Sequence, residues 1–188
     1  MSFFKLLLGF APWISLLVIA RDGLIRVKLG LVIALALSVI MGVARLNRGI
    51  ILWVGLLFLS YATIAVAVLD DIWTARHFGV LVNVALAVSA WATVAIGKPF
   101  SLDYAQEHTD PARWNQPDFI KANVFITSVW ATIFTTNAVL AWGKLVQFML
   151  PEWGYDVATY SLLIGAAAFT TWYPSHIRRG RRAPEQLL

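Results

Sequence analysis

Long apolar runs separated by short polar stretches dominate this sequence. Runs without Asp, Glu, Lys or Arg cover residues 6–20, 29–44, 49–69, 77–97, 122–143 and 157–177. A helix needs about 20 apolar residues to cross the hydrocarbon core of a bilayer. Four runs have that length, residues 29–44 are short but extendable, and residues 6–20 are marginal. The pattern predicts an all-α fold, a polytopic transmembrane helical bundle with five to six membrane segments.

Composition supports the membrane class. Of the 188 residues, 60% are hydrophobic and 13% are charged, whereas soluble domains carry roughly a quarter charged residues. There is no cysteine, which excludes disulfides, thiolate metal sites and thiol nucleophiles. The N-terminal apolar stretch lacks a convincing small-x-small cleavage site, so we expect a retained anchor. We expect one transmembrane domain over residues 1–188, with segments at about 6–20, 29–44, 49–69, 77–97, 117–150 and 157–177.

Turn and cap residues predict where some segments end. Pro99 disfavours the helical conformation in the residue before it, so the fourth segment should end there. In "NQPDFIKAN", Asn115 or Gln116 can cap a helix, and Pro117 suits its first position. The helix that begins at Pro117 is expected to run towards Leu150, where Pro151 stops it.

Residues 98–116 form a polar stretch that contains a cluster of potential ligands. Asp103 and Glu107 are four residues apart and would share a helical face, close to His108 and Asp110. Glu107 and His108 would point about 100° apart on a helix, however, so the ligands do not converge. Asp110 before Pro111 is typical of a helix cap. We interpret this stretch as an amphipathic segment on the inner membrane surface and expect no metal or catalytic site.

The distribution of basic residues predicts the orientation in the membrane. With six passes, one side holds Lys5, Arg45, Arg48, Lys98, Arg113, Lys121, Arg178, Arg179, Arg181 and Arg182. The other side holds Arg21, Arg26, Lys28, Arg76 and Lys144. We therefore expect both termini, including a basic tail at residues 178–188, in the cytoplasm. The basic residues of 21–28 fit poorly, so either the first segment is a short or re-entrant piece or this loop lies at the headgroups.

The predicted spans contain polar but uncharged residues. The absence of intramembrane charge argues against an ion-coupled transporter. Asn123, Thr127, Trp130, Phe134 and Asn137 recur at helical spacing on one face of the fifth segment, and the fourth segment carries Asn83. Such groups bond across helices as packing contacts, line a substrate path or face a partner.

Two ligand classes are not expected. His77 is predicted on the outer side, and His108 and His176 on the inner side. The two inner histidines lie at or beyond a span end rather than in its interior, which argues against a membrane haem, and we expect no cofactor. The aromatic residues cluster near span ends, as in headgroup belts, rather than alternating with basic residues along one groove. Nucleic acid is therefore not an expected partner.

Five short motifs follow one another in chain order. They are "FAPWISLLVIA", "ARLNRG", "LDD", "IGKPF" and "WNQPDFIKANVFITSVWATIFTTNAVLAW". In this order they resemble the intracellular septation protein A family, the YciB-like inner-membrane proteins of bacteria. On that match Trp114, Asn123, Trp130, Phe134 and Asn137 carry the Trp-to-Asn pattern. The resemblance implies a role in cell-envelope maintenance or division and no enzymatic site.

These observations predict a non-enzymatic protein of the bacterial inner membrane. We expect it to act through helix contacts with other integral membrane proteins and with membrane lipids. The candidate contact residues are Asn83, Trp114, Asn123, Trp130, Phe134 and Asn137. Two alternatives are a small carrier or channel for a neutral or lipid-like solute, lined by Asn83, Asn123 and Asn137, and an accessory subunit of a larger energy-converting membrane complex.

Overall fold

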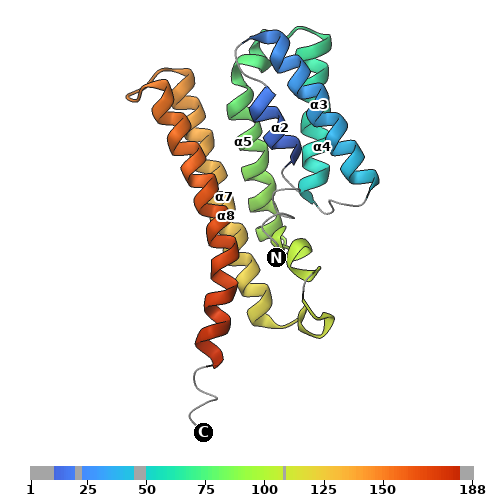
Figure 1. Cartoon of the computed structure of the whole chain (residues 1–188), viewed down its shortest axis with the longest axis vertical. Helices are drawn as coiled ribbons and strands as arrows, with labels where there is room; N and C mark the ends of the chain where they lie inside the picture. Colours follow the sequence, from blue (N-terminus) through green and yellow to red (C-terminus); the bar gives the residue numbers. More distant parts are fainter. Residues whose placement is uncertain (1–10, 20–22, 45–49, 108, 183–188) are drawn as a thin grey trace.

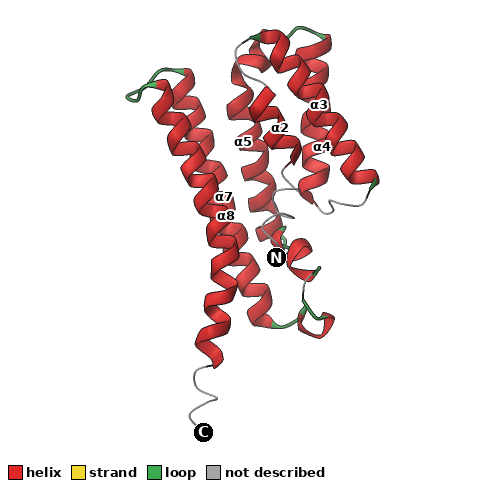
Figure 2. Ribbon diagram, in the orientation of Figure 1, coloured by secondary structure: helices red, strands yellow, loops and turns green. Residues whose placement is uncertain are grey.

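The computed structural model describes residues 11–19, 23–44, 50–107 and 109–182, and these residues form helices and turns with no strand (Figure 2). The elements in chain order are α2 (Ala11–Ile19), α3 (Leu24–Val43), α4 (Ile50–Ala62), the π-helix η1 (Thr63–Val68), α5 (Ile72–Ala95), α6 (Ser101–Gln106), the 3₁₀-helix η2 (Pro111–Arg113), α7 (Pro117–Leu145) and α8 (Glu152–Arg182). The predicted all-α class is confirmed.

Three of these helices, α3, α5 and α7, are long and apolar enough to cross a membrane. Helices α4 and η1 together supply a shorter apolar stretch, Leu52–Val68. Helix α8 has 31 residues and is long enough to cross a membrane, but it is less apolar than α3, α5 and α7 and is not among these candidate spans. Helix α2 has nine described residues, a length of about 13 Å against a hydrocarbon core of about 30 Å. The described residues thus contain three candidate spans, and the expected count of five to six stays a prediction.

The helices alternate in direction along the chain (Figure 1). One end of the molecule carries the η1–α5 and α7–α8 turns, and the opposite end carries α6, η2 and the last residues of α8. We call these the upper and lower ends, as they lie in Figure 1. Helix α7 packs against α5 and forms a long hairpin with α8, while α2 lies beside α3. Polar groups on α7 are therefore placed between two neighbouring helices.

The observed helix bounds extend beyond several apolar runs. Helix α3 begins at Leu24 and includes Arg26 and Lys28, and α5 begins at Ile72 rather than at residue 77. Asp71 caps α5, since its carboxylate accepts a hydrogen bond from the Trp73 backbone N–H at 3.0 Å. Basic side chains near a span end reach the headgroups along their apolar stems, so a charge does not mark the end of a helix.

Local signals explain most of the other helix ends. At the end of α5, Gly97 adopts φ +73°, and the Lys98 N–H donates to the Thr93 carbonyl at 2.9 Å. This is the Schellman arrangement, in which glycine is favoured. The Asp110 carboxylate accepts a bond from the Ala112 N–H at 2.9 Å at the start of η2, and α7 begins at Pro117. Both of these starts are confirmed as predicted.

The upper end of α7 differs from the prediction, because the helix ends at Leu145 and not near Leu150. Gln147 and Met149 adopt positive φ angles of 53° and 64°, and the Phe148 N–H donates to the Gly143 carbonyl at 2.9 Å. Lys144 forms an ion pair of 2.7 Å with Asp156 of α8. These contacts turn the chain five residues before Pro151 can act.

Helix α8 continues through Pro174 to Arg182. The expected segment 157–177 is therefore the middle of a longer helix, and the first residues of the expected basic tail are helical. Residues 183–188 lie outside the described residues, as do residues 6–10 of the expected first segment.

Candidate functional site

The face of α7 predicted from helical spacing points into the protein. Its buried residues are Asn123, Ile126, Thr127, Trp130, Ala131, Phe134 and Asn137. The prediction that four of the candidate contact residues share one helical face is confirmed. These four side chains make contacts within the chain. That they also contact a partner protein stays a prediction.

The lower part of this face forms a closed hydrogen-bond network with α6. The Ser101 hydroxyl lies 3.0 Å from both the side-chain and the backbone oxygen of Asn123, and it accepts from the Thr127 hydroxyl at 3.0 Å. The Asn123 amide nitrogen donates to the Phe119 carbonyl at 2.8 Å. All three side chains are buried, so the network fixes α6 to the base of α7.

The middle of this face contacts α8. The Trp130 indole N–H donates to the Thr170 hydroxyl at 2.9 Å, and that hydroxyl donates to the Ala166 carbonyl at 2.8 Å within its own helix. The Phe134 ring lies beside Trp130, with ring centroids 5.5 Å apart. A buried indole N–H with a partner stabilises this pairing of helices.

Asn137, near the upper end of the same face, has no such partner. Its side chain is 1% exposed, and neither its amide nitrogen nor its amide oxygen makes a hydrogen bond. Thr63 of η1 is the other described residue with a buried side-chain polar atom that lacks a partner. An unpaired buried amide costs roughly 1–3 kcal/mol, so we expect a use for Asn137 that offsets this cost.

The remaining two candidates lie apart from this face. Asn83 of α5 is partly buried and donates to the Gly79 carbonyl of its own helix at 2.8 Å. Trp114 follows η2, and its indole N–H donates to the Thr109 carbonyl at 2.9 Å. Neither is hydrogen-bonded to the other candidates in the described residues, so the structure does not assemble the six into one site.

The opposite face of α7 carries hydroxyl groups at exposed positions. Thr132 and Thr136 are exposed, and each donates to the backbone carbonyl four residues earlier, at 2.9 Å. Phe125 and Val139 extend the same exposed face, at 47% and 67% exposure. The hydroxyl protons are used within the helix, but the oxygen lone pairs remain free to accept a bond from a neighbouring helix.

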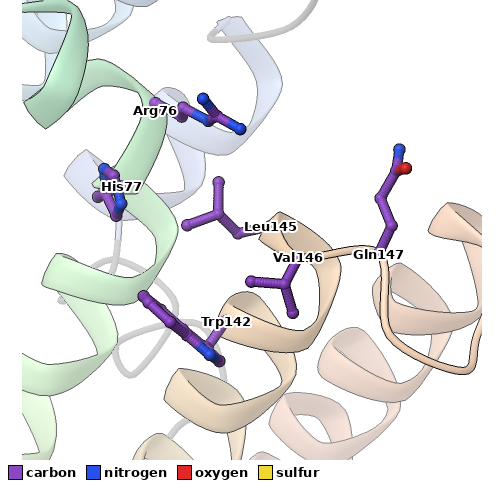
Figure 3. A pocket seen from close by; sticks show the side chains of 6 residues that line it. All are labelled: Arg76, His77, Trp142, Leu145, Val146 and Gln147. Atoms are coloured by element: carbon purple, nitrogen blue, oxygen red, sulfur yellow. The ribbon is translucent and has the colours of Figure 1, made fainter.

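A cleft of about 560 Å³ opens at the upper end between α5 and α7 (Figure 3). Its lining residues are Arg76 and His77 from α5, and Trp142, Leu145, Val146 and Gln147 from the end of α7 and the following turn. His77 stacks on Trp73 with ring centroids 4.4 Å apart, and its Nδ1 lies 2.8 Å from the Trp73 carbonyl oxygen. The cleft therefore combines a guanidinium group with an aromatic and aliphatic wall.

The acidic stretch at the lower end contains α6 and η2. Burial against neighbouring atoms raises the pKa of the Asp103 carboxyl and also raises the pKa of Tyr104. Among the residues that the structure describes, no group of three or more His, Asp or Glu side chains could hold a metal ion. His108 lies outside the described residues. That this stretch lies on a membrane surface stays a prediction.

Sequence reasoning missed the partners that complete these contacts. Ser101 and Thr170 are ordinary small polar residues, separated from Asn123 and Trp130 by 22 and 40 positions. Arg76 and Gln147 line the same cleft only because α5 packs on α7. Only the tertiary arrangement brings these residues together, since none of the three pairs follows a local spacing.

No family model, curated protein or solved structure matches the chain. The resemblance to the septation family thus remains an expectation from short motifs.

Proposed function

We propose that this protein is a non-enzymatic membrane scaffold that binds other integral membrane proteins through the exposed face of α7. The observation that carries the proposal is the position of Thr132 and Thr136. Both hydroxyl groups are exposed in the middle of a helix that is long and apolar enough to cross a membrane. Between transmembrane helices, Ser and Thr side chains form contacts worth about 0.5–2 kcal/mol each.

The inward face of α7 supports the same proposal. Hydrogen bonds within the chain occupy the polar groups of Asn123, Thr127 and Trp130. An aqueous path would instead be lined by polar groups that face one another across open space. The polar groups of the lower and middle interior are therefore better explained as packing contacts that hold α6 and α8 on α7.

The cellular setting is proposed from charge and from the resemblance. Lys98, Arg113 and Lys121 lie at the lower end with the last residues of α8. Placing this end in the cytoplasm satisfies the positive-inside rule and puts the end of α8 there, and from the charge count we propose the same side for the N-terminus. The setting is then the bacterial inner membrane, and the role is in cell-envelope maintenance or division.

Site-specific crosslinking tests the contact face. The chain has no cysteine, so a single introduced cysteine is its only thiol. Val139 on the α7 face and Val88 on α5 are exposed to similar extents, 67% and 62%. We expect Val139→Cys to crosslink to a membrane protein in intact cells and Val88→Cys not to do so. Crosslinks of equal yield at both positions, or at neither, would contradict the assignment.

The same partner should depend on the hydroxyl groups. Thr132→Val with Thr136→Val keeps the side-chain shape and removes both oxygens. We expect this double variant to lower recovery of the crosslinked partner in mild detergent. The matched change Thr171→Val on α8 should leave recovery unchanged.

A second candidate function is a carrier for a neutral or lipid-like solute, and the unpaired amide of Asn137 favours it. A carrier would need this amide to bond the solute during transport. Uptake or exchange by the purified chain in vesicles, abolished by Asn137→Leu and unaffected by Thr132→Val, would favour the carrier over the scaffold.

A further inference from the structure

The cleft at the upper end lies at the depth of lipid headgroups if the long helices cross a membrane. Arg76 lies four residues after the start of α5 at Ile72, a rise of about 6 Å along the helix axis. The headgroup zone on each side of a bilayer is about 5–7 Å thick. Trp73 and Trp142, on the two helices that form the cleft, have the amphipathic rings that prefer this zone.

The positive charge in the cleft is not neutralised by a described carboxylate. The two ion pairs at this end are Lys28 with Asp70 and Lys144 with Asp156. Asp71 is engaged in capping α5, where it also accepts from the Thr74 hydroxyl at 2.6 Å. Arg76 has no ion pair or hydrogen bond with any described residue, and no acidic side chain lines the cleft. The cleft therefore favours an anion.

The remaining lining favours an anion with an apolar body. Trp142 and Val146 are 52% and 51% exposed, and Leu145 lines the same wall (Figure 3). Gln147, across the opening from Arg76, has an amide that can donate hydrogen bonds. The turn beyond continues this apolar surface, with Phe148 63% and Met149 85% exposed.

We propose that the cleft binds an anionic phospholipid, with its phosphodiester group against Arg76 and Gln147 and its acyl chains against Trp142, Leu145 and Val146. A guanidinium group matches two phosphate oxygens in a bidentate pair. Among the described residues, no carboxylate lines the cleft to receive the ammonium group of a zwitterionic lipid, and Arg76 repels that group. The proposal rests on the membrane setting proposed above but needs no protein partner.

Lipid retention by the purified full-length chain tests this site. The chain is exchanged into mild detergent with equal amounts of phosphatidylglycerol and phosphatidylcholine, and retained lipids are counted by native mass spectrometry. Both lipids offer the same phosphodiester to Arg76, so the expected preference comes from the choline ammonium group, which Arg76 repels. We expect phosphatidylglycerol to be retained about tenfold over phosphatidylcholine. Arg76→Gln should remove this preference, and Arg76→Lys should restore part of it.

Arg113→Gln is the matched control, because Arg113 is an exposed arginine at the lower end. It should keep the preference of the wild type. A loss of equal size in both variants, or in neither, would overturn the proposal. Circular dichroism of each variant separates loss of the site from loss of the fold.

Two further experiments distinguish a phospholipid from a soluble phosphate ester as the ligand. Val146→Trp fills the cleft without changing charge and should lower retention of phosphatidylglycerol, and full retention would overturn the site. Free glycerophosphoglycerol has the same phosphodiester group without the acyl chains. If it displaced the lipid at equal concentration, the site would bind soluble phosphate esters, and the lipid assignment would be wrong.

Discussion

Asn123 and Asn137 are the same residue type on the same buried face of α7, fourteen positions apart, yet their surroundings differ. Asn123 donates to Phe119 and accepts from Ser101. Asn137 is equally buried, but neither polar atom of its side chain has a hydrogen-bond partner among the described residues. Helical spacing alone predicts the same surroundings for both residues. Their hydrogen bonding differs because Ser101 lies against Asn123, whereas no described polar group bonds to the Asn137 side chain.

The difference in hydrogen bonding indicates a structural role for one buried amide and a different role for the other, although the two are equally buried. A buried amide with partners on both sides holds the fold together, because removing it leaves other groups unpaired. A buried amide without partners weakens the fold, so its presence calls for another explanation. The lower end of α7 is therefore structural, and Asn137 is the buried amide on α7 that is left for an additional ligand or contact.

The largest effect is expected from Ser101, which completes the network around Asn123. Ser101→Ala leaves the Thr127 hydroxyl without its acceptor and the Asn123 side-chain oxygen without a donor. We expect a loss of about 2–3 kcal/mol in the free energy of unfolding in detergent. Ser89→Ala is the control, because Ser89 bonds only to the Ala85 carbonyl of its own helix. If both variants lost the same stability, the α6–α7 network would contribute nothing beyond helix propensity.

A smaller effect of opposite sign is expected from Asp103 on α6, the helix that Ser101 begins. Partial burial raises the pKa of this carboxyl above its ordinary value of 3.8, so the charged form is disfavoured in the folded state. The penalty is present above the raised pKa and disappears as the pH falls below the ordinary value. Asp103→Asn should therefore raise the melting temperature by about 1 °C at pH 7, a small gain because the side chain is exposed.

The pH dependence of that difference is the check. The advantage of Asp103→Asn over the wild type should shrink as the pH falls toward 4. An advantage that grew in acid would show that the carboxylate is stabilised in the fold.

Local signals in the sequence predicted much of this fold. The spacing along α7 identified its buried face, and Asp110 and Pro117 marked the starts of η2 and α7. The upper end of α7 was not predictable, because Gln147 takes a positive φ that a non-glycine residue rarely adopts. The count of five to six spans stays a prediction. Residues 157–177 contain no Asp, Glu, Lys or Arg, but their polar side chains leave α8 outside the group of three helices that are apolar enough to cross a membrane.

The hydrogen-bond partner of each buried polar group could not be predicted from the sequence either. The Asn123 side chain is satisfied because a turn carries Ser101 back onto α7 from the end of α5. Asn137 has no such neighbour among the described residues. Similarly, the cleft exists because α5 and α7 run antiparallel and bring Arg76 near Gln147. Such pairings depend on helix register and not on local spacing.

The most direct test of this comparison is equilibrium unfolding of Asn123→Leu and Asn137→Leu in the same detergent. Leucine roughly keeps the volume and removes both donor and acceptor. Asn123→Leu should lose about 1–2 kcal/mol, because the bonds to Phe119 and Ser101 disappear. Asn137→Leu should be as stable as the wild type or gain up to about 2 kcal/mol, because two unpaired polar groups leave the interior. A loss at Asn137 as large as the loss at Asn123 would contradict the distinction between the two ends of α7.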